Sequence, residues 1–439
     1  MADSNTILIS ILLASIRPQN LSQFFYNLVD SCDDKSCVEV WVKIDEGDEA
    51  MRECLELAQD VYPLTIRYLQ TPKEDGYYTL HHGYQQLYEA CNPNSYFIVV
   101  LNDEVRFATK GWDTILKKYV GMYPDDLFRI KVSQQKLRNY YSVYECGPCP
   151  DNYPITTRRW MELAEGIGDC WGPDVWHQMI DYHLGMASAP QADLFRSVPI
   201  HDIRIEGEEA GQQLSSETIR KRTVRIHQEW WRMVTVQKQQ KVRRLAVKLQ
   251  AYIWAKANLA VGFSIRDNFH SKIFEVYREG HDRPVMVLPY HLASSYVRWH
   301  RFSLLLRCIR GKLGDVRATL YAYIVSDRES TFWLFRYAQR CVNGAIVMLA
   351  FPTAFLWPHF GARPKKLWIE FCLWLNNYAY YIHYTIMEKR KGSEWVLANF
   401  QSFKTPYEKR YYQLLSYAKQ TYPTIYQSSG ASPSAKVAA

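Results

Sequence analysis

Two carboxylates stand side by side where a hydrophobic run of the sequence ends. Residues 96–101 are mostly β-formers, and Asn102, Asp103 and Glu104 follow them directly. In α/β folds, ligands bind at the carboxyl ends of the strands. Adjacent hard oxygen ligands at such a position suit a divalent cation, Mn²⁺ or Mg²⁺, that holds a diphosphate. An ordinary solvated turn is the other interpretation, and this segment alone does not decide between the two.

The elements that would position these carboxylates begin near the start of the sequence. Residues 10–18 predict a strand and a turn, residues 20–28 an amphipathic helix, and residues 38–44 a second strand that ends in the acidic run 45–49. Strand, helix, strand and acidic turn follow one another at the spacing of a βαβ unit. Strand-like and helix-like segments continue to alternate up to about residue 200, which predicts an α/β sandwich.

Asp45 is the first residue of that acidic run. A carboxylate at the end of the second strand can accept hydrogen bonds from ribose hydroxyls or from a base imide. Capping of the next helix is the alternative role.

The order and spacing of several segments resemble the family 2-like GT-A glycosyltransferases, which use nucleotide-sugar donors. The resemblance covers roughly residues 6–230 and rests on residues 10–18, 45–49, 102–104, Phe107, Gly111-Trp112, 123–126, 154–161 and 172–176. Two departures stand out. Ala14-Ser15-Ile16 replaces the family's Pro-Thr-Arg, and Asn102 stands where an acid is common, which leaves Asp103 and Glu104 as the carboxylates.

The resemblance implies the fold of the first domain, and residue composition indicates the regions that follow it. We expect an α/β protein, with a GT-A (Rossmann-like) mixed-sheet domain over residues 1–230. A mostly α-helical, basic and aromatic-rich region would follow over residues 231–427, and the Ser/Ala/Gly/Pro-rich residues 428–439 are expected to be disordered.

The resemblance also implies the binding residues. The nucleotide-sugar site would be formed by Ser15, Arg17, Asp45, Asn102, Asp103 and Arg158. The metal ligands would be Asp103, Glu104 and His201, with His227 as a fallback for the third. Arg158 and its neighbour Arg159 can contact phosphate through a planar donor fork, and a solvated pair at a helix start is equally open.

The catalytic base is expected to be an aspartate. The resemblance gives this role to Asp174, which would take the acceptor's proton in an inverting transfer, with Asp169 as the neighbouring alternative. Asp174 also stands at a predicted helix start, where it could act as an N-cap.

Charge is unevenly distributed along the chain. Residues 1–100 hold 15 acidic and 6 basic side chains, a balance of −9, so the remainder carries +17. A basic amphipathic segment at 234–253, a Trp- and Arg-containing segment at 296–312 and the apolar run 341–360 can contact a membrane surface. Packing of the first segment on its own domain is the alternative. For the run 341–360, an interfacial or re-entrant helix is favoured over a full span, and a buried core helix is the other interpretation. We therefore expect a cytoplasmic, peripheral protein at the inner face of a membrane, acting on a lipid-linked or envelope glycan.

The ten cysteines are scattered, and the apolar run 7–16 lacks a basic flank and predicts a buried strand. Reduced cytosolic thiols are the expected state. Cys146 and Cys149 have redox or zinc spacing, but no second cysteine pair lies near them in the sequence.

Two other functions compete with sugar transfer. Basic and aromatic residues together also suit nucleic-acid binding, but they lie among apolar runs without a recognised motif, so no nucleic acid is expected. A GT-A module that binds a sugar nucleotide without turnover is the third hypothesis, motivated by Asn102 and the altered first loop.

Overall fold

The computed structural model describes residues 7–74, 78–136, 139–141, 153–170, 172–184, 196–207, 236–259, 262–290, 384, 387–388 and 391–421. Several predicted features lie outside these residues: Cys146 and Cys149, His227, the segments 296–312 and 341–360, and the tail 428–439.

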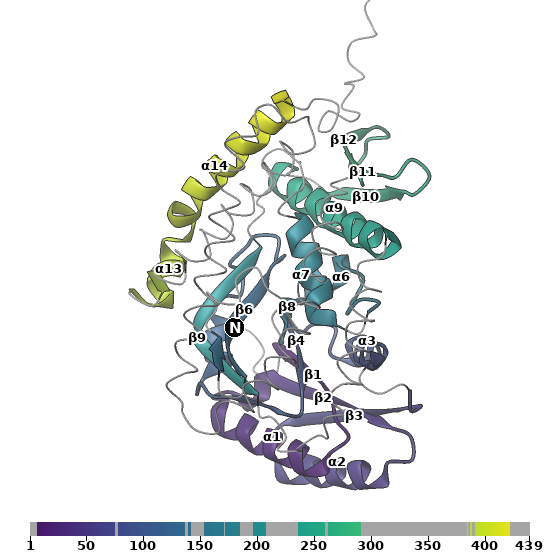
Figure 1. Cartoon of the computed structure of the whole chain (residues 1–439), viewed down its shortest axis with the longest axis vertical. Helices are drawn as coiled ribbons and strands as arrows, with labels where there is room; N and C mark the ends of the chain where they lie inside the picture. The colour runs from purple at the N-terminus through teal and green to yellow at the C-terminus, as the bar shows by residue number, and fades with distance from the viewer. Residues whose placement is uncertain are drawn as a thin grey trace, which may run out of the picture.

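A mixed sheet of nine described strands forms the centre of the molecule (Figure 1). The strands are β1 (Ile9–Ala14), β2 (Val38–Asp45), β3 (Thr65–Thr71), β4 (Phe97–Asn102), β5 (Val105–Phe107), β6 (Arg129–Lys136), β7 (Asn139–Tyr141), β8 (Ile155–Thr157) and β9 (Ser197–Gly207). Their order is β3-β2-β1-β4-β8-β6-β9-β5, with β7 paired to β6. The first four neighbours are parallel, whereas β8 runs antiparallel to both β4 and β6. The mixed α/β class predicted from the sequence is confirmed.

Helices cover both faces of this sheet (Figure 1). The described helices of this part are α1 (Pro18–Ser31), the short η1 (Lys35–Cys37), α2 (Glu49–Val61), α3 (Leu80–Ala90), α4 (Trp112–Lys117), α6 (Arg158–Leu163) and α7 (Pro173–Leu184). The alternation of β1 decides the layers, because successive side chains of a strand point to opposite faces. Ile9, Ile11 and Leu13 join the core under α1 and α2, whereas Leu12 and Ala14 face α3 and α6.

Local signals fix the helix starts. Pro18 occupies the first turn of α1, where the missing N–H costs nothing. Asp48 caps α2 by accepting a hydrogen bond from the Met51 backbone nitrogen at 3.1 Å. Two residues of the acidic run 45–49 therefore have different roles. Asp48 caps the helix, and Asp45 lies at the end of the strand.

The described residues after 235 pack on this first part of the chain. They form α9 (Val236–Asn258), β10 (Phe263–Asn268), β11 (Ile273–Arg278), β12 (Pro284–Pro289), α13 (Ser393–Ala398) and α14 (Phe400–Thr421). Apolar side chains of α9 and β11 share a core with α6 and α7, while Val396, Phe400 and Phe403 join the core under α1 and α2. The antiparallel sheet β10-β11-β12 is a feature that the expectation of a mostly helical region missed.

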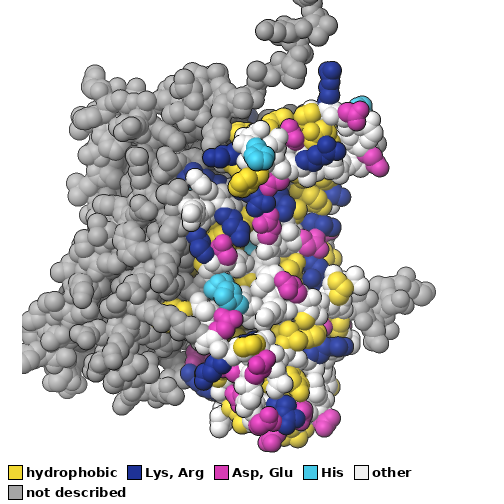
Figure 2. All heavy atoms as spheres, turned by 90° about the vertical axis from the view of Figure 1, so that its right-hand side faces the viewer, with side chains coloured by type: hydrophobic (Ala, Val, Ile, Leu, Met, Phe, Trp, Pro, Cys, Tyr) yellow, Lys and Arg dark blue, Asp and Glu magenta, His cyan; other side chains and the backbone are white. Residues whose placement is uncertain are grey.

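The basic residues of α9 contact acidic residues of the same chain. Lys238 and Lys241 pair with Asp169, and Arg244 and Lys248 pair with Glu165. Figure 2 shows acidic and basic side chains interspersed over the described part of one face. The described part of this segment, residues 236–253, thus packs on its own domain, which was the alternative to membrane contact. Among the described residues, no helix has an apolar stretch long enough to cross a membrane.

Residues 9–14 of the apolar run 7–16 form the expected strand, β1, which is buried along its whole length. The described cysteines are free thiols: Cys32, Cys37, Cys54, Cys91 and Cys170.

Candidate functional site

The carboxyl ends of β1, β2 and β4 meet at one edge of the sheet. Ala14, the last residue of β1, is in register with Lys43 of β2 and with Asn102 of β4. The chain proceeds from β1 outward through β2 to β3 and then returns to β4 on the other side of β1. Such a reversal of strand order is a topological switch point, where α/β sheets bind ligands. We call the residues gathered here the carboxyl-edge site.

Two side-chain contacts join the loop after β1 to the loop after β4. The Ser15 hydroxyl donates to Asp103 Oδ2 at 2.6 Å. The Arg17 guanidinium donates to Glu104 Oε1 at 2.8 Å, with both side chains about one-third exposed. Asn102 Oδ1 accepts a hydrogen bond from the Glu104 backbone nitrogen at 3.3 Å and so shapes the turn between them. Five of the predicted binding residues therefore lie at this edge: Ser15, Arg17, Asn102 and Asp103, together with Asp45, which is described below.

Burial changes the acidity of Asp103. Desolvation raises the pKa of this carboxyl, while the hydrogen bond from Ser15 and the charge of Arg17 act in the opposite direction. The neighbouring charge of Glu104 adds to the rise. A cation beside this carboxylate would favour its charged form.

Asp45 lies at the end of β2 and is held by a neighbour on its own strand. The Lys43 ammonium donates to Asp45 Oδ1. The stem of Lys43 passes beneath Gly83 of α3, where an added Cβ would lie 3.0 Å from Lys43 Cγ. The site thus has a lysine beside the candidate ribose-binding carboxylate, and a glycine makes room for it.

The first turn of α3 borders the same edge. Tyr84 donates from its hydroxyl to the Leu101 carbonyl oxygen at 2.6 Å, which fixes the helix to the end of β4. His81 lies one turn earlier, and burial lowers its pKa from 6.5 to about 4, with the charges of His82 and Lys238 acting in the same direction. His81 is therefore neutral at physiological pH.

Asp169 and Asp174 lie in the segment that opens α7. Lys238 Nζ is 3.2 Å from Asp169 Oδ1, and Lys241 Nζ is 3.3 Å from Oδ2. Asp174 is in the first turn of α7, whereas Asp181, two turns on, accepts a hydrogen bond from Ser197 at the start of β9. Because Ser197 lies at the amino end of a strand parallel to β6, α7 runs from the carboxyl edge toward the amino edge. Asp174 therefore starts on the side of the carboxyl-edge site.

Arg158 is not brought to this edge. It follows β8, which is antiparallel to β4, so it lies at the amino end of β4, where Thr157 pairs with Phe97. Its guanidinium donates to the Ser95 carbonyl at 3.0 Å and to the Ser95 hydroxyl at 2.6 Å. Arg158 therefore lies outside the carboxyl-edge site.

His201 does not belong to the strand ends that form this site. Its backbone lies within β9, which is separated from β4 by β8 and β6. The residue of β9 that pairs with Val105, just after Glu104, is Gly207. The described contacts therefore give no third ligand from β9.

The donor set at the end of β4 fits a cation that also binds phosphate oxygens. Among the described residues, no group of three His, Cys, Asp or Glu side chains could hold a metal ion. One oxygen of Asp103 accepts a hydrogen bond from Ser15, and one oxygen of Glu104 accepts a hydrogen bond from Arg17. Mg²⁺ sites in nucleotide-dependent enzymes commonly use one or two carboxylates, with phosphate and water completing the shell. The two carboxylates are compatible with that arrangement.

Sequence reasoning missed three residues of this region: Lys43, His81 and Lys238. The spacing of Lys43 two positions before Asp45 was a usable signal, because alternate residues of a strand share a face. The His81-His82 pair at a predicted helix start was another. The pairing of Lys238 with Asp169 depends on tertiary packing, which leaves no local signal.

In comparisons with known proteins, this chain matches solved structures. No family model matches the chain, and no curated protein sequence matches it. Among solved structures, a mannosyltransferase from Pyrobaculum calidifontis in complex with GDP-Man and Mn²⁺ is 12% identical, covers 86% of each chain and gives a TM-score of 0.39. S. aureus TarS residues 1–349 is 10% identical, with 57% of this chain and 73% of that chain covered and a TM-score of 0.36. The same TarS fragment with UDP-GlcNAc is 10% identical, with 57% and 74% covered and a TM-score of 0.35. Because all three TM-scores are below 0.5, the function proposed below rests on the residues of this chain.

Proposed function

We propose that this chain is a glycosyltransferase that moves a sugar from a nucleotide-sugar donor to a hydroxyl of a glycan or lipid-linked acceptor. One observation carries the proposal. The carboxyl ends of β1, β2 and β4 bring Ser15, Arg17, Asp45, Asp103 and Glu104 to one switch point of the sheet. Binding of a nucleoside diphosphate needs a cationic hydrogen-bond donor, a group that accepts hydrogen bonds from ribose hydroxyls, and paired carboxylates. All three kinds of group lie at this edge.

Each group has a role that follows from its chemistry. Asp45 accepts hydrogen bonds from ribose hydroxyls or a base imide. Arg17, in the loop after β1, donates to the diphosphate through its planar fork. A divalent metal, held by Asp103 and Glu104, would supply positive charge to the departing nucleoside diphosphate.

Asp174 is the proposed base for the acceptor hydroxyl, which attacks the anomeric carbon and gives an inverting transfer. Asp169 is the weaker candidate, because each of its carboxylate oxygens lies within 3.3 Å of an ammonium group. Both oxygens of Asp169 are thus occupied by contacts with lysines of α9 and are not free to contact an acceptor hydroxyl. Asp169 then serves to hold α9 against the segment that opens α7.

The acceptor class and the membrane surface are proposed from the sequence alone. The segments 296–312 and 341–360, which motivated a membrane surface as partner, lie outside the described residues. Flotation of the full chain with anionic and with neutral vesicles tests this part separately. Binding to neither kind of vesicle would remove the membrane from the proposal.

The test of the enzyme is a panel of UDP-, GDP-, CDP- and dTDP-sugars, assayed for binding by calorimetry and for nucleotide release. Each is measured with Mn²⁺ or Mg²⁺ and then with EDTA. One donor should bind and turn over in a metal-dependent manner, and Asp103→Ala should abolish both. Asp30→Ala is a matched control, because Asp30 forms only an exposed ion pair with Lys110.

The outcomes separate the competing functions. Metal-dependent binding without release, even with candidate acceptors, would favour a module that binds sugar nucleotides without turnover. Binding of DNA or RNA in place of every nucleotide sugar would replace the proposal with nucleic-acid binding. The absence of both binding and release would contradict the glycosyltransferase proposal altogether.

A further inference from the structure

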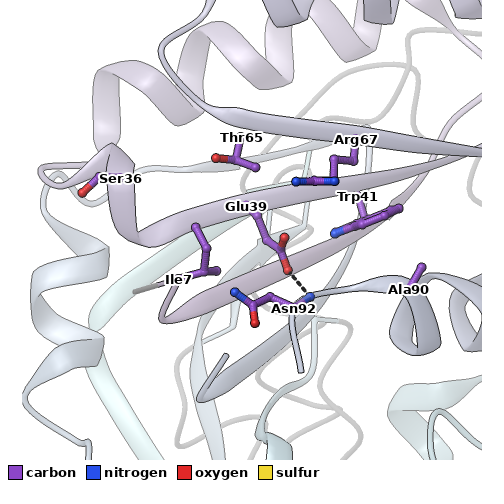
Figure 3. Close-up of a pocket in the computed structure, with 8 residues that line it drawn as sticks. All are labelled: Ile7, Ser36, Glu39, Trp41, Thr65, Arg67, Ala90 and Asn92. Atoms are coloured by element: carbon purple, nitrogen blue, oxygen red, sulfur yellow. Dashed lines mark hydrogen bonds between the residues drawn. The ribbon is translucent and has the colours of Figure 1, made fainter. Parts of the chain in front are cut away.

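A pocket opens at the edge of the main sheet opposite the carboxyl-edge site. It lies between β2, β3 and the end of α3, has a volume of about 500 Å³, and is lined in part by Glu39, Trp41, Arg67 and Asn92 (Figure 3). Glu39 precedes Asp45 by six residues on β2. At about 3.3 Å per residue of strand, this pocket is roughly 20 Å from the carboxyl-edge site. We call it the amino-edge pocket.

The floor of the pocket is a buried carboxylate that has one acceptor left over. Glu39 is 3% exposed, and its Oε1 accepts hydrogen bonds from the Ser10 hydroxyl and the Asn92 backbone nitrogen, both at 2.6 Å. No described residue donates to Oε2. Figure 3 shows the carboxylate between Arg67 and Asn92, with its second oxygen on the side of Arg67. Two neutral donors thus occupy Oε1, and Oε2 faces the pocket.

Beside this acceptor lies a donor that also has no partner. The indole Nε1–H of Trp41 is buried and makes no hydrogen bond among the described residues. Buried polar groups of native proteins are almost always paired, so an orphaned N–H calls for an explanation. In Figure 3 the nitrogen-bearing edge of Trp41 points to the side of Glu39. An unpaired donor and an unpaired acceptor therefore border the same small space.

Two more side chains complete the polar rim. The Arg67 guanidinium lies over the Trp41 ring, 5.8 Å from its centroid, and is not ion-paired with Glu39. Asn92 uses Oδ1 to accept from the Asn94 backbone nitrogen at 2.9 Å, which leaves its amide NH₂ as a donor. The pocket thus offers donors and acceptors in close alternation around an amphipathic aromatic ring.

We propose that the amino-edge pocket binds a neutral saccharide unit. Each sugar hydroxyl both donates and accepts, so a hydroxyl can donate to Glu39 Oε2 and accept from the Trp41 N–H at the same time. A bound cation is disfavoured because the Arg67 guanidinium lines the same pocket. A bound anion is disfavoured because Glu39 lies next to Arg67 on the pocket wall.

The role of this second site rests on the proposed function, although the binding itself does not. If the chain extends or decorates a glycan, a saccharide held about 20 Å from the carboxyl-edge site would be another unit of the same acceptor. Holding it there raises the effective concentration of the reacting end. Long acceptors should then react with a lower KM than short ones.

The experiment measures binding of the methyl glycosides of a hexose and an N-acetylhexosamine to the full chain, by saturation-transfer NMR and titration calorimetry. Alanine, a zwitterion, serves as the comparator ligand. We expect saccharide dissociation constants in the millimolar range. Trp41→Phe keeps a ring beneath Arg67 but removes the N–H, and Glu39→Gln replaces the free acceptor with a donor. Each should weaken saccharide binding at least tenfold.

The controls keep the two proposals apart. Asp103→Asn should lose nucleotide-sugar binding and keep saccharide binding at the amino-edge pocket, whereas Trp41→Phe should show the reverse. The proposal is overturned if no saccharide binds, if alanine binds in its place, or if both folded pocket variants bind saccharide as the wild type does. If no saccharide binds, the pocket holds only water, and this conclusion is independent of nucleotide-sugar binding at the carboxyl-edge site.

Discussion

The Ser15 hydroxyl and the Asp103 carboxylate are 2.6 Å apart, although 88 residues separate them in the chain. This contact joins the loops after β1 and β4, the two strands that flank the switch point. It also acts on acidity, since a hydrogen bond to the charged form of a carboxyl lowers its pKa against the effect of burial.

Ser15→Ala should therefore shift the acidic limb of the pH profile of kcat/KM. Loss of the hydroxyl raises the pKa of Asp103 further, so the required carboxylate is protonated, and activity lost, at a higher pH than in the wild type. One hydrogen bond corresponds to a shift of about half to one pH unit. Ser15→Thr keeps the hydroxyl and should keep the wild-type profile. Identical profiles for Ala and Thr would mean that Asp103 ionisation does not control the reaction.

Arg17→Gln should weaken binding of the nucleotide sugar by about tenfold or more, because a charge-assisted hydrogen bond to phosphate is lost. Calorimetry with the donor found in the panel measures this, and a nucleoside without phosphates should bind both proteins alike. Arg106→Gln is the matched control, since Arg106 pairs with Glu206 on the exposed side of β5. Unchanged affinity in Arg17→Gln would remove Arg17 from the phosphate site.

Asp174→Asn should lower kcat by roughly 10²- to 10⁴-fold, the usual contribution of a general base, with little change in donor affinity. Asp169→Asn should cost far less, because that carboxylate is already paired with Lys238 and Lys241. Single-turnover rates with saturating donor and acceptor compare the two variants. The opposite order of effects would transfer the role of base to Asp169.

Most of the carboxyl-edge site could be predicted from the sequence, because strand ends are visible in the hydrophobic pattern. Asp45 and Asp103 follow runs of buried residues, and parallel strands bring their ends to one edge. Lys43 was predictable in principle from the two-residue period of a strand.

Arg158 and His201 show what local patterns leave undetermined. β8 enters the sheet antiparallel to β4, so the residue after it lies at the amino edge, and nothing in residues 155–157 encodes that direction. The pairing of β9 with β6 shifts register after Ile200, so the position of His201 depends on an irregularity of the strand. Both are properties of the assembled sheet.

Breaking the buried ion pair between Arg196 and Asp125 should be costly. Their atoms are 2.7 Å apart, the side chains are 3% and 7% exposed, and Arg196 lies 4.3 Å from the centroid of Tyr123. Asp125→Asn removes the negative charge that faces this guanidinium, and breaking a buried ion pair in this way typically costs about 3–5 kcal/mol in the free energy of unfolding. Urea denaturation measures this loss. Lys110→Met, which breaks an exposed pair with Asp30, should cost less than about 1 kcal/mol, and equal losses in the two variants would contradict the argument.

His177 should make the folded state less stable in acid. Its Nδ1 accepts a hydrogen bond from the Trp160 indole at 3.1 Å, and burial, with the charge of Arg129, lowers its pKa from 6.5 to about 3. Between these values the unfolded chain binds a proton that the folded protein does not, so the free energy of unfolding falls as the pH falls. One such group contributes at most about 1.4 kcal/mol per pH unit.

His177→Gln keeps an acceptor for Trp160 and removes the titration. Urea denaturation from about pH 7 down to about pH 5 should therefore give a shallower slope for this variant. His281→Gln, at an exposed position, should keep the wild-type slope. A slope unchanged by His177→Gln would mean that the buried imidazole is protonated in the folded protein.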